Sequence, residues 1–397
     1  MSADDPNPVA FQDQPISQLL VKVATRCNID CSYCYWFRDA SVYDKPKLMS
    51  DDVLQRLLQR IEEHVAKHAA KGALADFPII LHGGEPLLWG VENFHRFAKA
   101  CDAIASRTGC DIPVAVTTNG VLIDDEWLNC FETNNISVAI SIDGPAHIHD
   151  IHRRTFQGTG THAAVERAAR MLASRDIGVM ALAVCNPAFP PEQYAAFFAA
   201  CGIVNYDIMI PDATVDEHPP SIASFYKGLF DVWLEANRSK PTANIRIVSD
   251  MITALLGNNA PTEGVGYKPV ELCTVMTDGS VEAHDVLRIA GDGFTHTTFN
   301  IFEHALDDVR QEPRWQAARD ASINLCEKCR QCKFMNACGG GYLPHRFSKH
   351  NGYDNPSVYC DDLYATFEHM QSVLESHLYV SKPGGERLSV RDALTRA

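Results

Sequence analysis

The sequence predicts an α/β protein built around a parallel β-sheet. Short apolar runs rich in β-branched residues alternate with amphipathic stretches between residues 19 and 236. Six expected strands and six expected helices follow one another in this region, and such alternation is typical of parallel βα units. Periodicity does not distinguish an open sheet from a barrel, so both arrangements fit the pattern.

The expected elements follow one another regularly along the chain. Strands are expected at residues 19–24, 77–81, 112–116, 137–140, 179–184 and 206–210. Helices are expected at residues 51–69, 91–107, 124–132, 162–174, 191–201 and 221–236. In the first helix, Leu54, Leu57 and Ile61 recur at helical spacing, and Ser50 is suited to cap its N-terminus.

The chain length of 397 residues predicts two domains. Residues 238–268 are rich in Ser, Asn, Pro and Gly around one helical piece at 247–256, which indicates a boundary. A hairpin is expected at 271–282. We therefore expect a flexible arm, a first domain, a bridging segment, a second domain, and a C-terminal helix and tail, at residues 1–17, 18–237, 238–268, 269–365 and 366–397.

Composition and charge exclude several classes of protein. The formal net charge of −15 argues against a nucleic-acid partner, which needs a basic surface. The first residues do not form a signal peptide, and no apolar run approaches the ~20 residues that span a bilayer. We therefore expect a cytoplasmic protein, whose 14 cysteines are metal ligands or buried side chains before they are disulfides.

Cys27, Cys31 and Cys34 follow the first expected strand within eight residues. Soft thiolates select iron–sulfur clusters, zinc or copper(I). A closed structural zinc site needs four ligands, and this loop supplies three. The loop therefore favours an iron–sulfur cluster that keeps one iron open for another ligand.

Polar residues occupy the turns after the next three expected strands. His82-Gly83-Gly84-Glu85-Pro86 pairs two glycines, which allow close backbone approach, with a carboxylate that can accept from an ammonium group. The following turns carry Asn119, Ser141 and Asp143, and Arg153 or Arg154 comes shortly afterwards. Parallel α/β folds place ligand sites at such strand ends, although each turn taken alone is also typical of an ordinary connection.

The spacing Cys-x3-Cys-x2-Cys, with Tyr33 before the last cysteine and Gly-Gly-Glu-Pro further on, resembles radical S-adenosylmethionine (SAM) enzymes. The resemblance implies a partial (β/α)6 TIM-like barrel at 18–237 and a 4Fe–4S cluster on Cys27, Cys31 and Cys34. That cluster would reduce SAM to a 5′-deoxyadenosyl radical, with electrons from a donor such as flavodoxin or ferredoxin. The implied SAM contacts are Tyr33, Gly83, Gly84, Glu85, Asn119, Ser141, Asp143 and Arg153.

A second cysteine group lies near the C-terminus and consists of Cys329, Cys332, Cys338 and Cys360. Four thiolates suit zinc and a 4Fe–4S cluster equally well. Their spacing resembles the SPASM domain, the auxiliary-cluster extension of radical SAM enzymes, here at 269–365. Full SPASM domains hold two auxiliary clusters, but this chain has His284 and Tyr342 where two cysteines of the first are expected. The sequence therefore predicts one auxiliary 4Fe–4S cluster.

Residues 338–360, together with 210–214 and 277–282, resemble the branch of peptide maturases that form three-residue cyclophanes. The resemblance implies a ribosomally made precursor peptide, abstraction of a β-hydrogen, and a carbon–carbon crosslink to an aromatic side chain. Asp212, Asp216 or Asp285 would take the proton that leaves. With no N-terminal extension of ~80 residues, the peptide's leader would bind elsewhere or to a separate leader-binding protein.

Other functions fit the same motifs. A radical enzyme of this kind can instead form a thioether, a cyclopropane or an epimerised residue, or can mature a sulfatase by oxidising one Cys or Ser. The missing first auxiliary cluster speaks against sulfatase maturation. A zinc-bound, non-catalytic peptide-binding scaffold is the alternative outside the enzymes.

Overall fold

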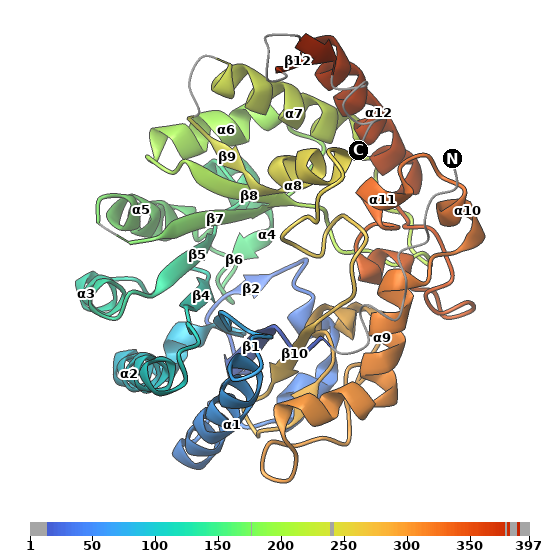
Figure 1. Cartoon of the computed structure of the whole chain (residues 1–397). Coiled ribbons are helices and arrows are strands. Elements are labelled where there is room, and N and C mark those ends of the chain that lie inside the picture. The colour runs from blue at the N-terminus through green and yellow to red at the C-terminus, as the bar shows by residue number, and fades with distance from the viewer. Residues whose placement is uncertain (1–13, 176, 239–241, 378, 382–386, 390–397) are drawn as a thin grey trace. The chain divides into compact units, whose positions relative to one another are not determined.

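A computed structural model describes residues 14–175, 177–238, 242–377, 379–381 and 387–389 (Figure 1). Most of the expected N-terminal arm, residues 1–13, and the last part of the expected tail, residues 390–397, lie outside the described residues. The chain divides into two compact units, which are described separately. The first unit comprises Met1–Ala183, Phe197–Ile203 and Pro269–Asp320, and the second comprises Val184–Ala196, Val204–Lys268 and Ala321–Ala397.

A mostly parallel sheet forms the centre of the first unit, with the strand order β11-β10-β1-β3-β4-β5-β7. Its parallel strands in chain order are β1 (Gln18–Ala24), β3 (Ile79–Gly83), β4 (Val114–Thr118), β5 (Ser137–Ser141), β7 (Val179–Val184) and β10 (Leu272–Val275). The short β11 (Val281–Glu282) pairs antiparallel with β10, which confirms the expected hairpin. Because β10 pairs with β1 in parallel, the segment after residue 269 extends the sheet beside the first strand.

Helices cover the outer face of this sheet, where Figure 1 shows α1, α2, α3 and α5. These helices are α1 (Asp51–Ala69), α2 (Val91–Thr108), α3 (Asp125–Thr133) and α5 (His162–Ala173), and the shorter α4 (Ala146–His152) precedes α5. The expected cap is confirmed, because Ser50 Oγ accepts the N–H of Val53 at 3.4 Å. The expected strands and helices of this region are thus present, with their ends shifted by up to two residues.

Apolar side chains of the strands and helices form the core of the first unit. Leu81, Val116 and Ile140 contribute fully buried strand side chains, and Leu57 and Phe94 contribute fully buried helix side chains. Burying a side chain of this size stabilises the fold by about 1.5–3 kcal/mol. The core therefore holds the strand ends, and the turns that follow them, in fixed positions.

The second unit is mainly helical. It contains β8 (Asn205–Met209), which pairs in parallel with β9 (Asn244–Ile245), and the helices α7 (Ala223–Asn237), α8 (Arg246–Leu255), α10 (Glu327–Arg330), α11 (Met335–Cys338) and α12 (Cys360–His377). In this unit α12 packs against α7 and α8, as Figure 1 shows. Asp362 of α12 accepts the backbone N–H groups of Ile222 and Ala223, so it caps the start of α7.

The remaining elements straddle the two units or are short. Helices α6 (Pro191–Ala200) and α9 (Pro313–Ile323) each contain residues of both units. The short 3-10 helices include η2 (Trp36–Arg38), η4 (Pro86–Trp89), η5 (Asp285–Ala290) and η6 (Leu306–Gln311). Among the residues that the structure describes, no helix is long and apolar enough to cross a membrane.

Candidate active site

The loop that carries Cys27, Cys31 and Cys34 is held by backbone pairing on two sides. The N–H groups of Gly84 and Glu85 donate to the carbonyls of Ala24 and Arg26 at 2.8 and 2.9 Å. On the other side, the two-residue strand β2 (Asp30–Cys31) pairs antiparallel with β6 (Arg153–Arg154), so that Cys31 lies opposite Arg153. The three cysteines are half-buried. The sequence segments around residues 84 and 153 therefore fix the loop from outside.

Gly83 and Gly84 are required by the close approach of the turn after β3 to this loop. A Cβ atom on Gly83 would lie 2.1 Å from the carbonyl oxygen of Ala24, and one on Gly84 would lie 2.4 Å from that of Arg26. Any other side chain would displace the loop. The expected close backbone approach is present, and the backbone that these glycines approach is that of the cysteine loop. A contact of these glycines with SAM stays a prediction.

Glu85 lies fully buried at the end of the same turn. Its carboxylate accepts from the N–H groups of Leu87 and Asn119 at 3.0 and 2.8 Å, and from the Thr118 hydroxyl at 2.7 Å. Burial raises the pKa of Glu85 to about 7, although these hydrogen bonds counteract the shift. A cation placed beside this carboxylate would therefore stabilise its ionised form.

Asn119 connects the third turn to the cysteine loop. Its side-chain amide donates to Asn28 Oδ1 at 2.7 Å and lies 3.5 Å from Cys27 Sγ. Amide donors near a cluster thiolate tune its charge. Ser141, at the C-terminal end of β5, is half-buried. SAM contacts by Asn119 and Ser141 stay predictions.

Tyr33, Asp143 and Arg153 form a compact polar cluster beside Cys31. The Tyr33 hydroxyl and Arg153 Nε both donate to Asp143 Oδ2, at 2.5 and 3.0 Å. The Arg153 guanidinium also lies 5.3 Å from the centre of the Tyr33 ring. The turn offered Arg153 or Arg154, and the resemblance implied Arg153; the structure buries Arg153 in this cluster and leaves Arg154 exposed.

The donors of the first cysteine loop fit an iron–sulfur cluster. Burial raises the pKa of Cys27 to about 12 and that of Cys31 to about 11, and a bound metal ion would offset this because it holds its thiolates deprotonated. A closed tetrahedral zinc site needs four ligands, and the loop supplies three cysteines, which fits a cluster that keeps one iron open.

Asp285, one of the three expected proton acceptors, is buried in an ion pair. Lys22 Nζ lies 2.5 Å from its Oδ2, and the hydroxyl of Tyr35 donates to the same oxygen at 2.5 Å. Burial alone would raise the pKa of Asp285, but the Lys22 ammonium group and its other neighbours lower it well below the ordinary value. A carboxylate held in this state is a weak base, so its contacts suit it to position Tyr35, the residue after Cys34.

Asp212 and Asp216, the other two expected proton acceptors, belong to the second unit. Asp212 is half-buried, whereas Asp216 is exposed and accepts the N–H of Lys349 at 2.9 Å. The neighbouring Glu217 accepts from the N–H and the hydroxyl of Thr214, which closes the turn between them. Their role in a reaction stays a prediction.

The C-terminal cysteine segment, residues 326–360, is organised by short helical turns. The N–H of Cys332 donates to the carbonyl of Cys329, and the N–H of Cys338 donates to that of Phe334. Burial raises the pKa of Cys338 to about 12, and negative charge on Cys360 and Cys332 adds to the shift, so the three sulfurs lie within electrostatic reach. Four thiolates so arranged fit the expected auxiliary cluster.

Sequence reasoning missed a buried charged network next to the cysteine loop. Lys22 Nζ lies 3.1 Å from His82 Nδ1 and 4.6 Å from the centre of the Trp36 ring. Nearby, Arg288 is fully buried and pairs with Asp39 and Glu282. A lysine inside the apolar run of the first strand was the signal in the sequence, because lysine is rarely fully buried unless it is paired.

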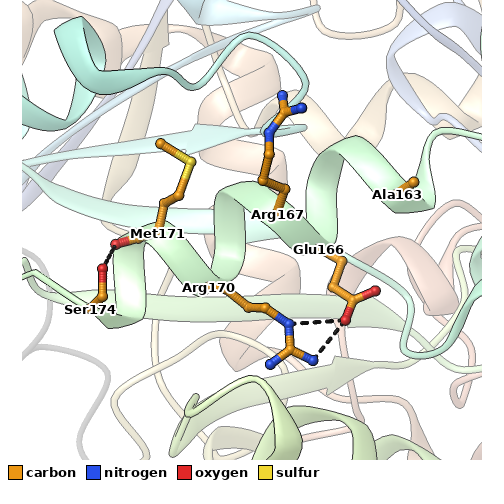
Figure 2. Close-up of a pocket in the computed structure, with 6 residues that line it drawn as sticks. All are labelled: Ala163, Glu166, Arg167, Arg170, Met171 and Ser174. Atoms are coloured by element: carbon orange, nitrogen blue, oxygen red, sulfur yellow. Dashed lines mark hydrogen bonds and ion pairs between the residues drawn. The ribbon is translucent and has the colours of Figure 1, made fainter.

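A separate hollow on the first unit lies along α5 (Figure 2). Its lining residues come from one face of this helix and are Ala163, Glu166, Arg167, Arg170, Met171 and Ser174. Glu166 and Arg170 form an ion pair at 2.7 Å, one turn apart. The hollow includes none of the cysteines or strand-end turns described above, so it is not the candidate active site.

Comparisons with known proteins show which proteins this chain is similar to. Residues 21–201 match the radical SAM superfamily. The cysteine-type anaerobic sulfatase-maturating enzyme of Clostridium perfringens is 24% identical over 371 residues, covering 89% of this chain and 96% of that protein.

Solved structures show the same fold. The enzyme anSMEcpe, solved with bound AdoMet and the Cp18Cys peptide, has a TM-score of 0.78 at 23% identity, covering 90% of this chain and 97% of that one. Streptococcus suis SuiB, solved bound to its precursor peptide SuiA, has a TM-score of 0.59 at 15% identity, covering 87% and 76%. The expected radical SAM partial barrel is confirmed. Residues 21–201 therefore carry a radical SAM domain, and the chain is related to the anaerobic sulfatase-maturating enzymes.

Proposed function

We propose that this enzyme oxidises one residue of a peptide or protein substrate at its β-carbon. One observation carries the proposal. The turns that bear Glu85 and Asn119 hydrogen-bond to the loop that bears Cys27, Cys31 and Cys34, so the buried carboxylate lies beside that loop. The relatives support the substrate class, because anSMEcpe and SuiB were each solved with a peptide.

The cysteine loop would hold a 4Fe–4S cluster with one open iron, and the cluster and SAM together supply a 5′-deoxyadenosyl radical when bound. Glu85 would accept the ammonium group of SAM, since a cation is the partner that its buried carboxylate lacks among the contacts described. Arg153 would sit near the SAM carboxylate, with Asp143 and Tyr33 fixing its position.

The substrate loses a hydrogen atom from its β-carbon to that radical, and then one proton and one electron. In the sulfatase-maturating type, a Cys side chain becomes a thioaldehyde, and water converts it to an aldehyde with release of hydrogen sulfide. Cys329, Cys332, Cys338 and Cys360 would hold the acceptor of the second electron. The relatives favour this type of oxidation.

A second candidate reaction is the cyclophane crosslink. In that reaction the β-carbon radical adds to a ring carbon of a nearby aromatic residue, and the ring then loses one proton and one electron. The observation that favours it is His284, which is buried at a position where a first auxiliary cluster would need a cysteine. Buried Arg288, paired with Asp39 and Glu282, lies close to it along η5 and is likewise no cluster ligand.

Mass spectrometry of substrate peptides distinguishes the two reactions. The reconstituted enzyme, with SAM and a reductant, is given a Cys-containing sulfatase peptide, its Cys→Ser and Cys→Ala forms, and an aromatic-containing peptide encoded beside the enzyme's gene. Sulfatase-type oxidation of the Cys peptide exchanges sulfur for oxygen, removes two hydrogens, and creates an aldehyde that reacts with a hydrazide. A crosslink removes two hydrogens, survives thiol alkylation and yields no aldehyde.

The matched control is the Cys31→Ala variant, which should give none of these products. Release of 5′-deoxyadenosine without a mass change in any peptide would contradict both reactions with these substrates. It would leave epimerisation as a possible reaction. Epimerisation leaves the mass unchanged, and deuterium from solvent in the peptide detects it.

A further inference from the structure

The first unit contains a further group of metal-ligating side chains, which includes none of the cysteines of the loop or of the C-terminal segment. His64 and His68 lie one turn apart on the same face of α1, and Asp307 of η6 lies against them. Among the described residues, these three are brought together so that one ligand atom from each lies within 4.8 Å of the other two. Both histidines are buried, with exposed fractions of 3% and 7%.

Two buried polar atoms of this group lack hydrogen-bond partners. His64 Nδ1 and Asp307 Oδ1 lie 3.3 Å apart, both are buried, and neither has a hydrogen-bond partner. The other nitrogen of His64, Nε2, lies 2.8 Å from the carbonyl oxygen of Ile16 and therefore carries the proton as its donor. Nδ1 of a neutral His64 then presents a lone pair to a carboxylate oxygen, which is unfavourable unless a proton on Nδ1 or a metal ion lies between them.

The geometry points to a zinc site formed by His64, His68 and Asp307. Zn–N and Zn–O bonds of about 2.1 Å in a tetrahedron separate two ligand atoms by about 3.4 Å, which matches the 3.3 Å between His64 Nδ1 and Asp307 Oδ1. Two histidines at i and i+4 on a helix are a known zinc-binding arrangement. The carbonyl of Ile16 fixes the tautomer of His64, as the neighbours of metal-bound histidines do.

Two contacts compete with the ion. His68 Nε2 lies 2.7 Å from Asp307 Oδ2 and would exchange this hydrogen bond for the metal. Lys67 Nζ lies 2.6 Å from the same oxygen, but its side chain is 54% exposed and can turn into solvent. Oδ1 remains the free oxygen. Water would complete the tetrahedron.

The site would join three segments: α1, η6, and the chain that enters β1 at Ile16. Since β1 leads into the cysteine loop, zinc would stabilise the strand that precedes this loop. It would not contact SAM or the substrate. The inference is therefore independent of the proposed function.

Metal analysis of the full-length, anaerobically reconstituted protein tests the site. With the cysteines occupied by iron, the protein is equilibrated with chelator-buffered zinc, and zinc and iron per chain are measured by mass spectrometry. We expect one zinc per chain in the wild type and in His350→Gln, an exposed control, and none in His68→Gln or Asp307→Asn. Iron should be the same in all four.

Lys67→Ala sharpens the test, because it removes a competing cation and keeps all three ligands. It should bind zinc several-fold more tightly than the wild type, and zinc should raise the unfolding temperature of both. Equal zinc in the wild type and Asp307→Asn, iron in place of zinc at the triad, or no zinc in the wild type and Lys67→Ala would each overturn the proposal. The stabilisation by zinc decides the matter if the ligand variants fail to fold.

Discussion

The first cysteine loop takes its neighbours from turns far apart in the sequence, whereas the backbone N–H groups of two cysteines in the C-terminal segment bond to carbonyls within that segment. Around the loop, Gly84, Asn119 and Arg153 come from three different parts of the chain. In the segment, the hydrogen bonds of Cys332 and Cys338 run to carbonyls three and four residues away.

One cation beside each group is compared, Arg153 and Lys328, although buried Arg346 also lies beside the C-terminal cysteines. Arg153, opposite Cys31, is buried and bonded to Asp143, while Lys328 is 60% exposed and only partly offsets the rise that burial causes in the pKa of Cys360. A buried ion pair is costly to break, but an exposed lysine contributes little. The protein should therefore lose much more stability when the buried cation is removed than when the exposed one is.

The largest expected effect comes from removing one cysteine of each group. The wild type with two 4Fe–4S clusters should contain about eight irons per chain, and Cys31→Ala and Cys338→Ala should each contain about four. Cys31→Ala should lose SAM cleavage, because the open iron is gone, while Cys338→Ala should keep it and lose the modified peptide. Iron analysis and 5′-deoxyadenosine release measure both effects. Twelve irons in the wild type would contradict the single auxiliary cluster.

Arg153→Gln and Lys328→Gln compare the two cations directly. Arg153→Gln leaves Asp143 buried without its charge partner and should lower the free energy of unfolding by about 3–5 kcal/mol. Lys328→Gln should lower it by at most about 1 kcal/mol. Denaturant unfolding gives both values, with Arg154→Gln, the exposed neighbour, as a control. Similar losses from Arg153→Gln and Lys328→Gln would remove the contrast between these two cations.

Gly84→Ala tests whether the loop depends on close backbone approach. The added methyl group would lie 2.4 Å from the carbonyl oxygen of Arg26, so we expect a loss of about 1–3 kcal/mol and a lower iron content. Gly264→Ala is the matched control, because nothing lies within 3.8 Å of its added Cβ, and it should change stability by at most about 0.5 kcal/mol. Full iron incorporation in Gly84→Ala would show that the turn is not a support for the loop.

Glu85→Gln tests the buried carboxylate through pH. With a pKa of about 7, Glu85 is about one-tenth ionised at pH 6 and nine-tenths ionised at pH 8. Since the ammonium group of SAM would bind the ionised form, SAM affinity should rise about tenfold between these pH values in the wild type. In Glu85→Gln the affinity should be weak and nearly constant. Equilibrium binding of SAM measures this, and a wild type without pH dependence would exclude the contact.

Much of the fold was predictable because its signals are local. Apolar strand runs and helical periodicity located the six βα units, and Ser50 marked the start of α1. The short pair of β2 and β6 and the pairing of β10 with β1 were not predictable, since neither segment carries periodicity long enough to identify its partner. Register between distant segments depends on tertiary packing.

In the candidate site, too, local motifs were predictable and contacts between distant residues were not. Cys27, Cys31, Cys34 and Glu85 stand in short motifs, so the sequence by itself determined the chemistry of the site. The choice of Arg153 over Arg154, and the ion pair of Lys22 with Asp285, were decided by the tertiary structure. Lys22 and Asp285 lie 263 positions apart in the chain, and the residues around each of them do not predict the other as its partner. Burial selects such partners, because a charge removed from water is stable only beside its counter-ion.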